Sequence, residues 1–457
     1  MSDSRSPHRF HAAHALLAGG WARDVQLQVQ DGRITAIRTG QDAQPGDTRV
    51  GILVPGLPNL HSHAFQRGMA GLTEIGGGDG DSFWSWRELM YRFVQRLDPD
   101  SLQAIAEQAY VEMLEAGFTR VGEFHYLHHG PDGRPYADPG EMATRIAAAA
   151  QASGIGLTLL PVFYAHADFG GAPPSPAQAR LIHDVDGFAR LLEASDAAIA
   201  PLGDGVLGLA PHSLRAVTPE ELTALLPLTR GPVHLHIAEQ TREVEACRAW
   251  SGQRPVRWLL DHAPVDARWC LVHATHVEAD EVQGMVEAGA VVGLCPITEA
   301  NLGDGLFPMR DFARAGGRFG VGSDSNVLID AAEELRLLEY GQRLLARGRN
   351  VLAQGQGTSS GRWLFEQALH GAAQALGTQA GLQVGAAADL VELGADHPAL
   401  RARQGDAWLD SWLFAARRGA VRQVWRQGRL VVRDGRHVDA AAVATRYAAA
   451  LDRVLRA

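Results

Sequence analysis

The sequence predicts an α/β protein: a (β/α)8 barrel of the TIM type, with a small β-sandwich domain built from both chain ends. Three observations support this fold class. Eight short β-like runs alternate with helical segments, histidine and carboxylate residues follow several of these runs, and alternating strand patterns stand near both termini. In a barrel of this type, the residues at the carboxyl ends of the strands meet at one face.

The first 50 residues are predicted to be β-structure. Residues 25–29 and 33–37 alternate between apolar and polar side chains, with Asp31-Gly32 between them. Such a pair between two alternating runs is a strong hairpin signal. Residues 388–393 and 421–432 are also β-like. We expect one small β domain from both ends, because chain termini often lie close together.

In the middle of the chain, β-like runs alternate with helical segments, as in a (β/α)8 barrel. The β-like runs are residues 52–60, 120–124, 156–163, 206–210, 232–237, 268–273, 290–295 and 318–322. Helical patterns occupy residues 101–116, 141–152, 177–194, 220–226, 278–288 and 331–346. Such a series favours a closed barrel. A doubly wound open sheet is the alternative, but no glycine-rich dinucleotide fingerprint follows the first run.

These patterns divide the chain into three parts. Residues 1–54 form the first part of the β-sandwich, residues 55–380 the barrel, and residues 381–457 the second part of the sandwich with a terminal helix.

Composition limits the function. The chain has 457 residues, 46% hydrophobic and 21% charged, as in a soluble enzyme. Its net charge of −10 gives no electrostatic footprint for nucleic acid or an anionic membrane, so an anionic substrate needs local positive charge. Three cysteines without zinc-knuckle spacing fit a reducing cytosol. We see no signal peptide and no apolar run of bilayer length, and expect a cytoplasmic protein.

A glycine-rich stretch precedes an aromatic one. Residues 76–81 lack the Lys-Ser/Thr of a phosphate-binding loop and are interpreted as a mobile linker. Residues 83–87 contain two tryptophans and Arg87. This second stretch is either a lid over an active site or a helix start that packs its tryptophans on the barrel.

Histidines and carboxylates stand where barrel strands are predicted to end. His61 and His63 are two residues apart, so both imidazoles can point to one side of a strand. His236 is followed by Glu239, a carboxylate placed for proton transfer beside a metal-bound water. His234 is expected to pack deeper in the barrel.

Two later runs complete the set. His273 ends the sixth run and is given the catalytic role, while His276 is expected to be supporting or at the surface. Asp324 ends the eighth run, where the alternative interpretation is a helix N-cap. Three histidines and one aspartate with an open position suit one zinc ion or another borderline divalent ion.

The order of these residues resembles the amidohydrolase superfamily, in particular its mononuclear deaminase branch: His-x-His after strand one, His-x-x-Glu after strand five, His after strand six and Asp after strand eight. No lysine stands where the binuclear branch carries a carboxylated one. The motifs at 58–67, 123–126, 210–215 and 299–305 are similar to those of the formimidoylglutamate deiminases of histidine degradation. Ile297 departs from that family, in which threonine is expected.

The resemblance implies hydrolysis of N-formimino-L-glutamate to N-formyl-L-glutamate and ammonia. It implies metal ligation by His61, His63, His236 and Asp324. Asp324 would take a proton from the water, His273 would orient the hydroxide, and Glu239 would protonate the imino nitrogen and the leaving ammonia.

The resemblance also implies the residues that bind the small anionic substrate: Gln66, Arg87, Tyr126, His212 and Arg215. Arginine forks bind carboxylates bidentately. The family further implies a homodimer.

Three other functions are the alternatives. A nucleobase or other heterocycle deaminase could use the same metal site, but a ring substrate would need stacking aromatics rather than arginines. A non-catalytic barrel that serves as a binding module usually loses metal ligands, and here all the expected positions are filled. A metal-dependent phosphoesterase would need a two-metal, carboxylate-rich centre, for which the sequence shows no bridging residue.

Overall fold

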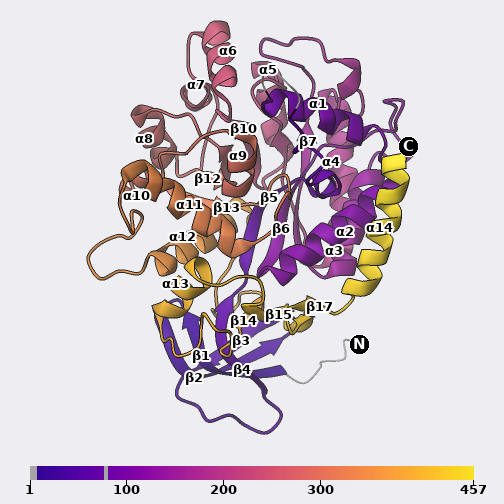
Figure 1. Cartoon of the computed structure of the whole chain (residues 1–457). Coiled ribbons are helices and arrows are strands. Elements are labelled where there is room, and N and C mark those ends of the chain that lie inside the picture. Colours follow the sequence, from indigo (N-terminus) through magenta and orange to yellow (C-terminus); the bar gives the residue numbers. More distant parts are fainter. Residues whose placement is uncertain (1–7, 77–80, 457) are drawn as a thin grey trace.

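The computed structural model describes residues 8–76 and 81–456, which form an α/β barrel and a smaller β domain (Figure 1). The barrel strands are β5 (Leu57–Ser62), β6 (Phe118–His125), β7 (Gly156–Phe163), β8 (Val206–Leu207), β9 (Ala210–Pro211), β10 (Val233–Ile237), β11 (Trp269–His273), β12 (Val291–Leu294) and β13 (Arg318–Val321). Every hydrogen-bonded pair among them is parallel. The predicted α/β class is therefore confirmed.

The barrel strands form two hydrogen-bonded sheets, β5 to β8 and β10 to β13, with β9 paired to β7. Isolated parallel bridges join the sheets at both seams. Leu209 bridges to Val233 on one side, and Ser62 bridges to Asp324 on the other. The strands thus follow one another in barrel order, and the last strand, β13, lies beside the first, β5.

The helices surround these strands (Figure 1). They are α1 (Phe83–Val94), α2 (Pro99–Glu115), α3 (Glu141–Ser153), α4 (Val185–Ile199), α5 (Pro219–Leu225), α6 (Thr241–Ser251), α7 (Pro255–His262), α8 (Ala279–Ala288), α9 (Pro296–Leu302), α10 (Met309–Arg314), α11 (Ala331–Ala346), α12 (Ser360–Ala375), α13 (Asp406–Phe414) and α14 (Ala440–Arg456). Local sequence explains several starts. Asp98 caps α2 by accepting a hydrogen bond from the Ser101 amide, and Pro99 occupies the first turn.

Two predicted strands differ from those observed. The run 52–60 is split at Gly56 between two sheets: β4 (Thr48–Pro55) pairs with the C-terminal strands, and β5 enters the barrel. A Cβ atom on Gly56 would lie 2.2 Å from the side chain of Thr119, so only glycine fits. The run 206–210 is not one strand, because β8 and β9 are separate two-residue segments on β7.

One predicted helix begins later than expected. The helical pattern at 177–194 yields an α-helix only from residue 185, where Asp184 provides the N-cap. The carbonyl of Arg180 accepts hydrogen bonds from the amides of His128 and His129, at 3.2 and 3.0 Å. The backbone before α4 is thus paired with another loop instead of coiling.

The small domain is one eight-stranded sheet in the order β17-β16-β15-β14-β4-β1-β2-β3. Its other strands are β1 (His8–Leu17), β2 (Gly20–Gln30), β3 (Arg33–Arg38), β14 (Leu390–Leu393), β15 (Val421–Arg426), β16 (Arg429–Arg433) and β17 (Arg436–His437). Antiparallel pairing of β4 with β14 brings the two chain ends together. We propose domain boundaries near residues 54 and 380.

The hairpins of this sheet follow from their turn residues. Asp31 and Gly32 have φ of 48° and 77°, and Gln427 and Gly428 have φ of 51° and 73°. Two consecutive positive φ values match the right-handed twist of the flanking strands. The predicted hairpin at Asp31-Gly32 is therefore present.

The barrel and the small sheet are joined by a buried ion network. Arg120 of β6 contacts Asp204 at 2.5 Å, and Arg426 of β15 contacts both Asp204 and Asp389, the latter at 2.8 Å. Both guanidiniums are almost fully buried, with 8% and 5% of their side chains exposed.

In the described part of the chain, no helix is both long and apolar enough for a membrane span.

The ion network gives a test of stability. Asp204→Asn removes the carboxylate that Arg120 and Arg426 share, and leaves the buried guanidinium of Arg120 without an ion pair, while Arg426 keeps Asp389. We expect the free energy of unfolding to fall by about 3 kcal/mol, measured by denaturant titration, with a lower thermal midpoint. The control is Asp132→Asn, which removes an exposed ion pair with Arg134 and should change little. Equal losses in the two variants would contradict the role of the network.

Candidate metal centre

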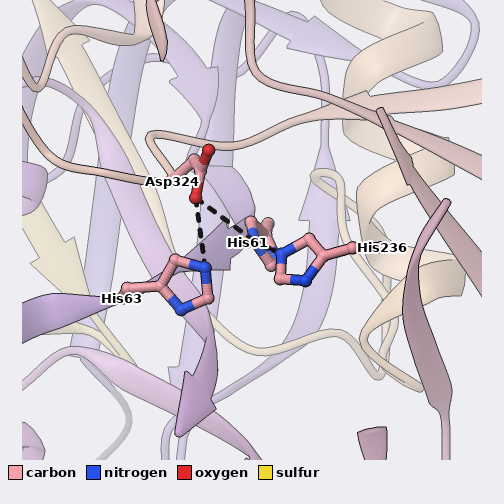
Figure 2. Close-up of side chains that lie close together, drawn as sticks. All are labelled: His61, His63, His236 and Asp324. Carbon is pink, nitrogen blue, oxygen red and sulfur yellow. Dashed lines mark hydrogen bonds and ion pairs between the residues drawn. The ribbon is translucent and has the colours of Figure 1, made fainter. Parts of the chain in front are cut away.

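Three histidines and an aspartate converge at the carboxyl ends of the barrel strands. His61 lies in β5 and His63 directly follows it, His236 lies in β10, and Asp324 follows β13. Their side chains point toward one another (Figure 2), and one ligand atom of each lies within 4.8 Å of the others. All four residues are buried. The structure thus brings together the four residues predicted as metal ligands.

The inner nitrogens of these imidazoles face a common point. His61 Nε2 is 2.9 Å from His236 Nε2 and 3.4 Å from Asp324 Oδ1, and His63 Nε2 is 3.2 Å from Asp324 Oδ1. On the outer side, His63 Nδ1–H donates to the carbonyl of Phe124 at 3.0 Å, and His236 Nδ1–H donates to the carbonyl of His212 at 3.1 Å.

Those outer hydrogen bonds fix the tautomers, because a carbonyl oxygen can only accept. With the proton on Nδ1, the Nε2 lone pairs of His63 and His236 point inward, which is the arrangement of metal-bound histidine. The Nε2 atoms of His61 and His236 lie 2.9 Å apart, within hydrogen-bond distance, so both rings face the same point. The donor set fits a borderline divalent metal ion.

The backbone holds the ligands through contacts between β5 and β13. The amide of Asp324 donates to the carbonyl of His61 at 3.0 Å, and the amide of His63 donates to the carbonyl of Asp324 at 2.9 Å. Asp324 has φ of 42°, a left-handed conformation that aspartate tolerates better than most residues. A Cβ atom on Gly322 would lie 2.7 Å from a backbone atom of His61, so the close approach requires glycine.

Electrostatics favour the ligand forms of these groups. Burial lowers the pKa of His61 to about 3 and holds the pKa of His236 well below its usual value. Burial would raise the pKa of Asp324, but its close contacts with His61 and His63 outweigh it and keep this pKa well below the usual range. Neutral imidazoles and an ionised carboxylate are the states that bind a cation.

Two of the predicted acid–base residues lie beside the metal ligands. His273 Nε2 is 3.7 Å from Glu239 Oε1 and 3.9 Å from Asp324 Oδ2. Burial raises the pKa of Glu239 to about 7, so its carboxyl group can give or take a proton near neutral pH. Burial alone would lower the pKa of His273, but neighbouring carboxylates, Glu239 foremost, raise it to about 10.

Two carboxylates near this pair were assigned no role from the sequence. Glu299 Oε1 lies 3.3 Å from His273 Nδ1 and also accepts a hydrogen bond from the Cys295 amide. Asp304 has a carboxylate oxygen within 4.8 Å of ligand atoms of Glu239 and His273. Burial raises the pKa of Asp304 to about 9. Both residues belong to the motif at 299–305 after the seventh barrel run, which was the signal available in the sequence, but it gave neither residue a role.

A pocket opens above the metal ligands. Its walls include all five residues predicted to bind substrate: Gln66, Arg87, Tyr126, His212 and Arg215. Gln66 Nε2 donates to the Tyr126 hydroxyl at 2.8 Å. His63, His236, Glu239, His273 and Asp324 also line it. The pocket therefore joins the metal ligands to two arginines.

Other residues singled out in the sequence lie elsewhere. His234 is buried and hydrogen-bonds to the carbonyl of Ala375 at 2.7 Å, deeper in the barrel. Ile297 is buried and does not line the pocket. Of the glycine-rich stretch at 76–81, residues 77–80 lie outside the described residues. Residues 83–87 begin α1, and Phe83, Trp86 and Arg87 reach the pocket wall.

Comparison with known proteins identifies the family of the chain. Residues 52–431 match the family model described as amidohydrolase family, and residues 8–51 match the model for the formimidoylglutamate deiminase HutF N-terminal domain. A formimidoylglutamate deiminase of Pseudomonas aeruginosa is 54% identical over 93% of this chain and 95% of its own length. An 8-oxoguanine deaminase of the same organism is 28% identical over 74% of this chain and 75% of its own.

Solved structures show the same fold. An amidohydrolase from Brucella melitensis superposes with a TM-score of 0.95, 54% identity, and coverage of 98% of this chain and 100% of its own. An adenosine deaminase from Xanthomonas campestris with bound zinc has a TM-score of 0.80, 23% identity, and coverage of 99% and 100%. At 23% identity, the similarity to the adenosine deaminase supports the fold alone.

The metal ligands can be tested one at a time. His236→Ala removes one inward imidazole, and we expect the affinity for a divalent ion to fall by more than about 100-fold. Competition with a chelator, followed by metal analysis, measures this loss. The control is His276→Gln, at a histidine outside the four-residue cluster, which should keep its metal. Equal metal retention by both variants would rule out His236 as a ligand.

Proposed function

Because the chain belongs to the amidohydrolase family, we propose that it hydrolyses N-formimino-L-glutamate to N-formyl-L-glutamate and ammonia, a step of histidine degradation. One observation supports this most: a single pocket is lined by three of the four metal-ligand residues, the Glu239–His273 pair and two arginines. The substrate has a cationic amidine and two carboxylates, and the pocket offers a partner for each. The relative from Pseudomonas aeruginosa with 54% identity carries the name of this activity.

We propose one zinc ion, held by His61, His63, His236 and Asp324, although other divalent ions also suit these ligands. Such an ion lowers the pKa of a bound water toward about 7 and so supplies hydroxide at neutral pH. The family model and the four convergent ligands support a metal.

The proposed chemistry divides between three residues. Asp324 accepts a proton from the attacking water, and His273, 3.9 Å from Asp324, orients that water toward the amidine carbon. Glu239 faces the amidine, holds the proton on the imino nitrogen and then helps deliver one to the departing ammonia. The pKa of Glu239, about 7, allows both states of the carboxyl group near neutral pH.

Recognition of the glutamate part falls to the other pocket residues. Arg87 and Arg215 supply guanidinium forks for the carboxylates. Gln66 and Tyr126, already hydrogen-bonded to each other, and His212 add orienting contacts. Because the net charge of the chain is −10, these local donors decide whether an anion can enter.

A heterocycle deaminase is the second candidate. The pocket also contains Phe83, Trp86 and Tyr91, on which a ring could stack, and an 8-oxoguanine deaminase is among the relatives. Arg87 and Arg215 favour the dicarboxylate instead, since a neutral ring leaves both guanidiniums unpaired.

We also propose a homodimer in the cytoplasm. The homodimer rests on the family resemblance. The location rests on the proposed step of histidine degradation and on three cysteines that are free and buried.

The deciding experiment measures ammonia release from N-formimino-L-glutamate by zinc-loaded protein and identifies the product by mass. Ammonia together with N-formyl-L-glutamate would establish the reaction and the C–N bond that breaks. Absence of turnover with zinc bound would overturn the substrate, and nucleobases would then be assayed.

Glu239 gives a sharper test of the chemistry. Glu239→Gln keeps the size of the side chain but cannot carry the proton, so kcat should fall by a factor of about 10² to 10⁴ with metal content unchanged. Steady-state kinetics and metal analysis measure the two quantities. The control is Glu245→Gln, an exposed carboxylate on α6. A kcat equal to that of the unchanged protein would remove Glu239 from the mechanism.

A further inference from the structure

Three arginines gather around one tryptophan at the pocket. The Cζ atom of Arg87 lies 4.6 Å from the ring centroid of Trp84, that of Arg242 lies 4.5 Å away, and that of Arg215 lies 5.7 Å away. Trp84 and Arg87 belong to α1, Arg215 follows β9, and Arg242 lies in the first turn of α6. The indole is thus a common platform for guanidiniums from three segments.

These guanidiniums lack protein partners. Within residues 8–76 and 81–456, Arg87, Arg215 and Arg242 have no ion pair closer than 4.0 Å and no side-chain hydrogen bond. The Nε atoms of Arg87 and Arg215 are buried without a hydrogen-bond partner. Burial would lower the pKa of Arg215, but Glu243 foremost, with Tyr164 and Glu239, raises it, so the charge of Arg215 is partly compensated although its Nε–H has no acceptor.

The cluster is costly without an anion. Stacking on an aromatic ring stabilises a guanidinium by about 0.5–1 kcal/mol at an exposed site, and each arginine repels the other two. Buried N–H donors without acceptors add a further cost. A bound carboxylate removes both costs at once, because it screens the charges and accepts the free N–H groups.

We propose that Arg242 is a third carboxylate-recognition residue, which binds the γ-carboxylate of the substrate from the edge of the Trp84 platform. This proposal rests on the proposed function and deepens it. Arg242 is exposed and absent from the pocket wall, whereas Arg87 and Arg215 line that wall. Arg242 therefore stands at the outer side of the cluster.

The geometry of the substrate selects the γ-carboxylate. The formimino nitrogen is attached to the α-carbon, so with the amidine at the metal ligands the α-carboxylate stays deep and the γ-carboxylate points outward. The deep pair, Arg87 and Arg215, can share both carboxylates, and Arg242 reaches the outer one. Because Arg242 meets the substrate at the side away from the reacting carbon, it acts on binding more than on the chemical step.

The test compares two arginines of one helix. Arg242→Gln should raise KM for N-formimino-L-glutamate by about tenfold, as expected for a lost hydrogen bond to a charged group, with kcat nearly unchanged. The matched control is Arg248→Gln, an exposed arginine nearer the end of α6, which should leave KM unchanged. Equal thermal midpoints establish that both variants fold.

A second substrate identifies the group that Arg242 binds. N-Formimino-L-glutamine carries an amide in place of the γ-carboxylate. The Arg242→Gln penalty on KM should disappear with this substrate, since the charged acceptor is gone. An equal penalty with both substrates, or no penalty with either, would overturn the assignment of Arg242 to the γ-carboxylate.

Calorimetry separates this inference from the proposed reaction. Glutarate, a dicarboxylate without an amidine, should bind the zinc-loaded protein about tenfold more weakly after Arg242→Gln and equally well after Arg248→Gln. If the unchanged protein binds glutarate but does not hydrolyse N-formimino-L-glutamate, the proposed function fails and the anion site stands. Equal glutarate affinity in all three proteins would overturn the role of Arg242.

Discussion

The contact between the carboxyl ends of β5 and β13 is the constraint on which the rest of the site depends. The amides of His63 and Asp324 exchange hydrogen bonds with the carbonyls of Asp324 and His61, and Ser62 bridges to Asp324. This contact joins the first and last barrel strands, and in the same step it sets two imidazoles beside a carboxylate. Closing the barrel and assembling the ligands are therefore one structural event, although 260 residues separate the two segments in the sequence.

Polar side chains stabilise this contact from below. Asn59 Nδ2 donates to Ser323 Oγ at 2.7 Å, and Asn326 Nδ2 donates to the carbonyl of His63 at 3.0 Å. All of these groups are buried, so each lost bond would leave an unpaired polar atom in the barrel. These bonds hold the two ligand segments together, although Nδ1 of His61 is buried without a hydrogen-bond partner.

The sequence predicted the fold class and the identity of the convergent residues better than the strand boundaries. Each histidine or aspartate at a strand end says little alone, so His61, His236 and Asp324 were predicted from the order in which these patterns follow one another along the chain. The division of residues 52–60 at Gly56 could not, because an apolar run has the same pattern in either sheet and only the approach of Thr119 requires the break. The contact of Asp304 with Glu239 could not be predicted either, because the two residues come from loops that are far apart in the sequence.

Charge is distributed unevenly along the pocket, and this distribution orients a substrate. Glu239 and Asp324 line the pocket beside the metal-ligand cluster, whereas guanidiniums without an ion pair gather around Trp84. A molecule with a cationic amidine at one end and carboxylates at the other is aligned by both fields, with its reacting carbon at the metal ligands. A neutral ring receives no such alignment. The same separation explains how a chain of net charge −10 can accept an anion: the repelling charges lie deep, and the attracting ones are met first.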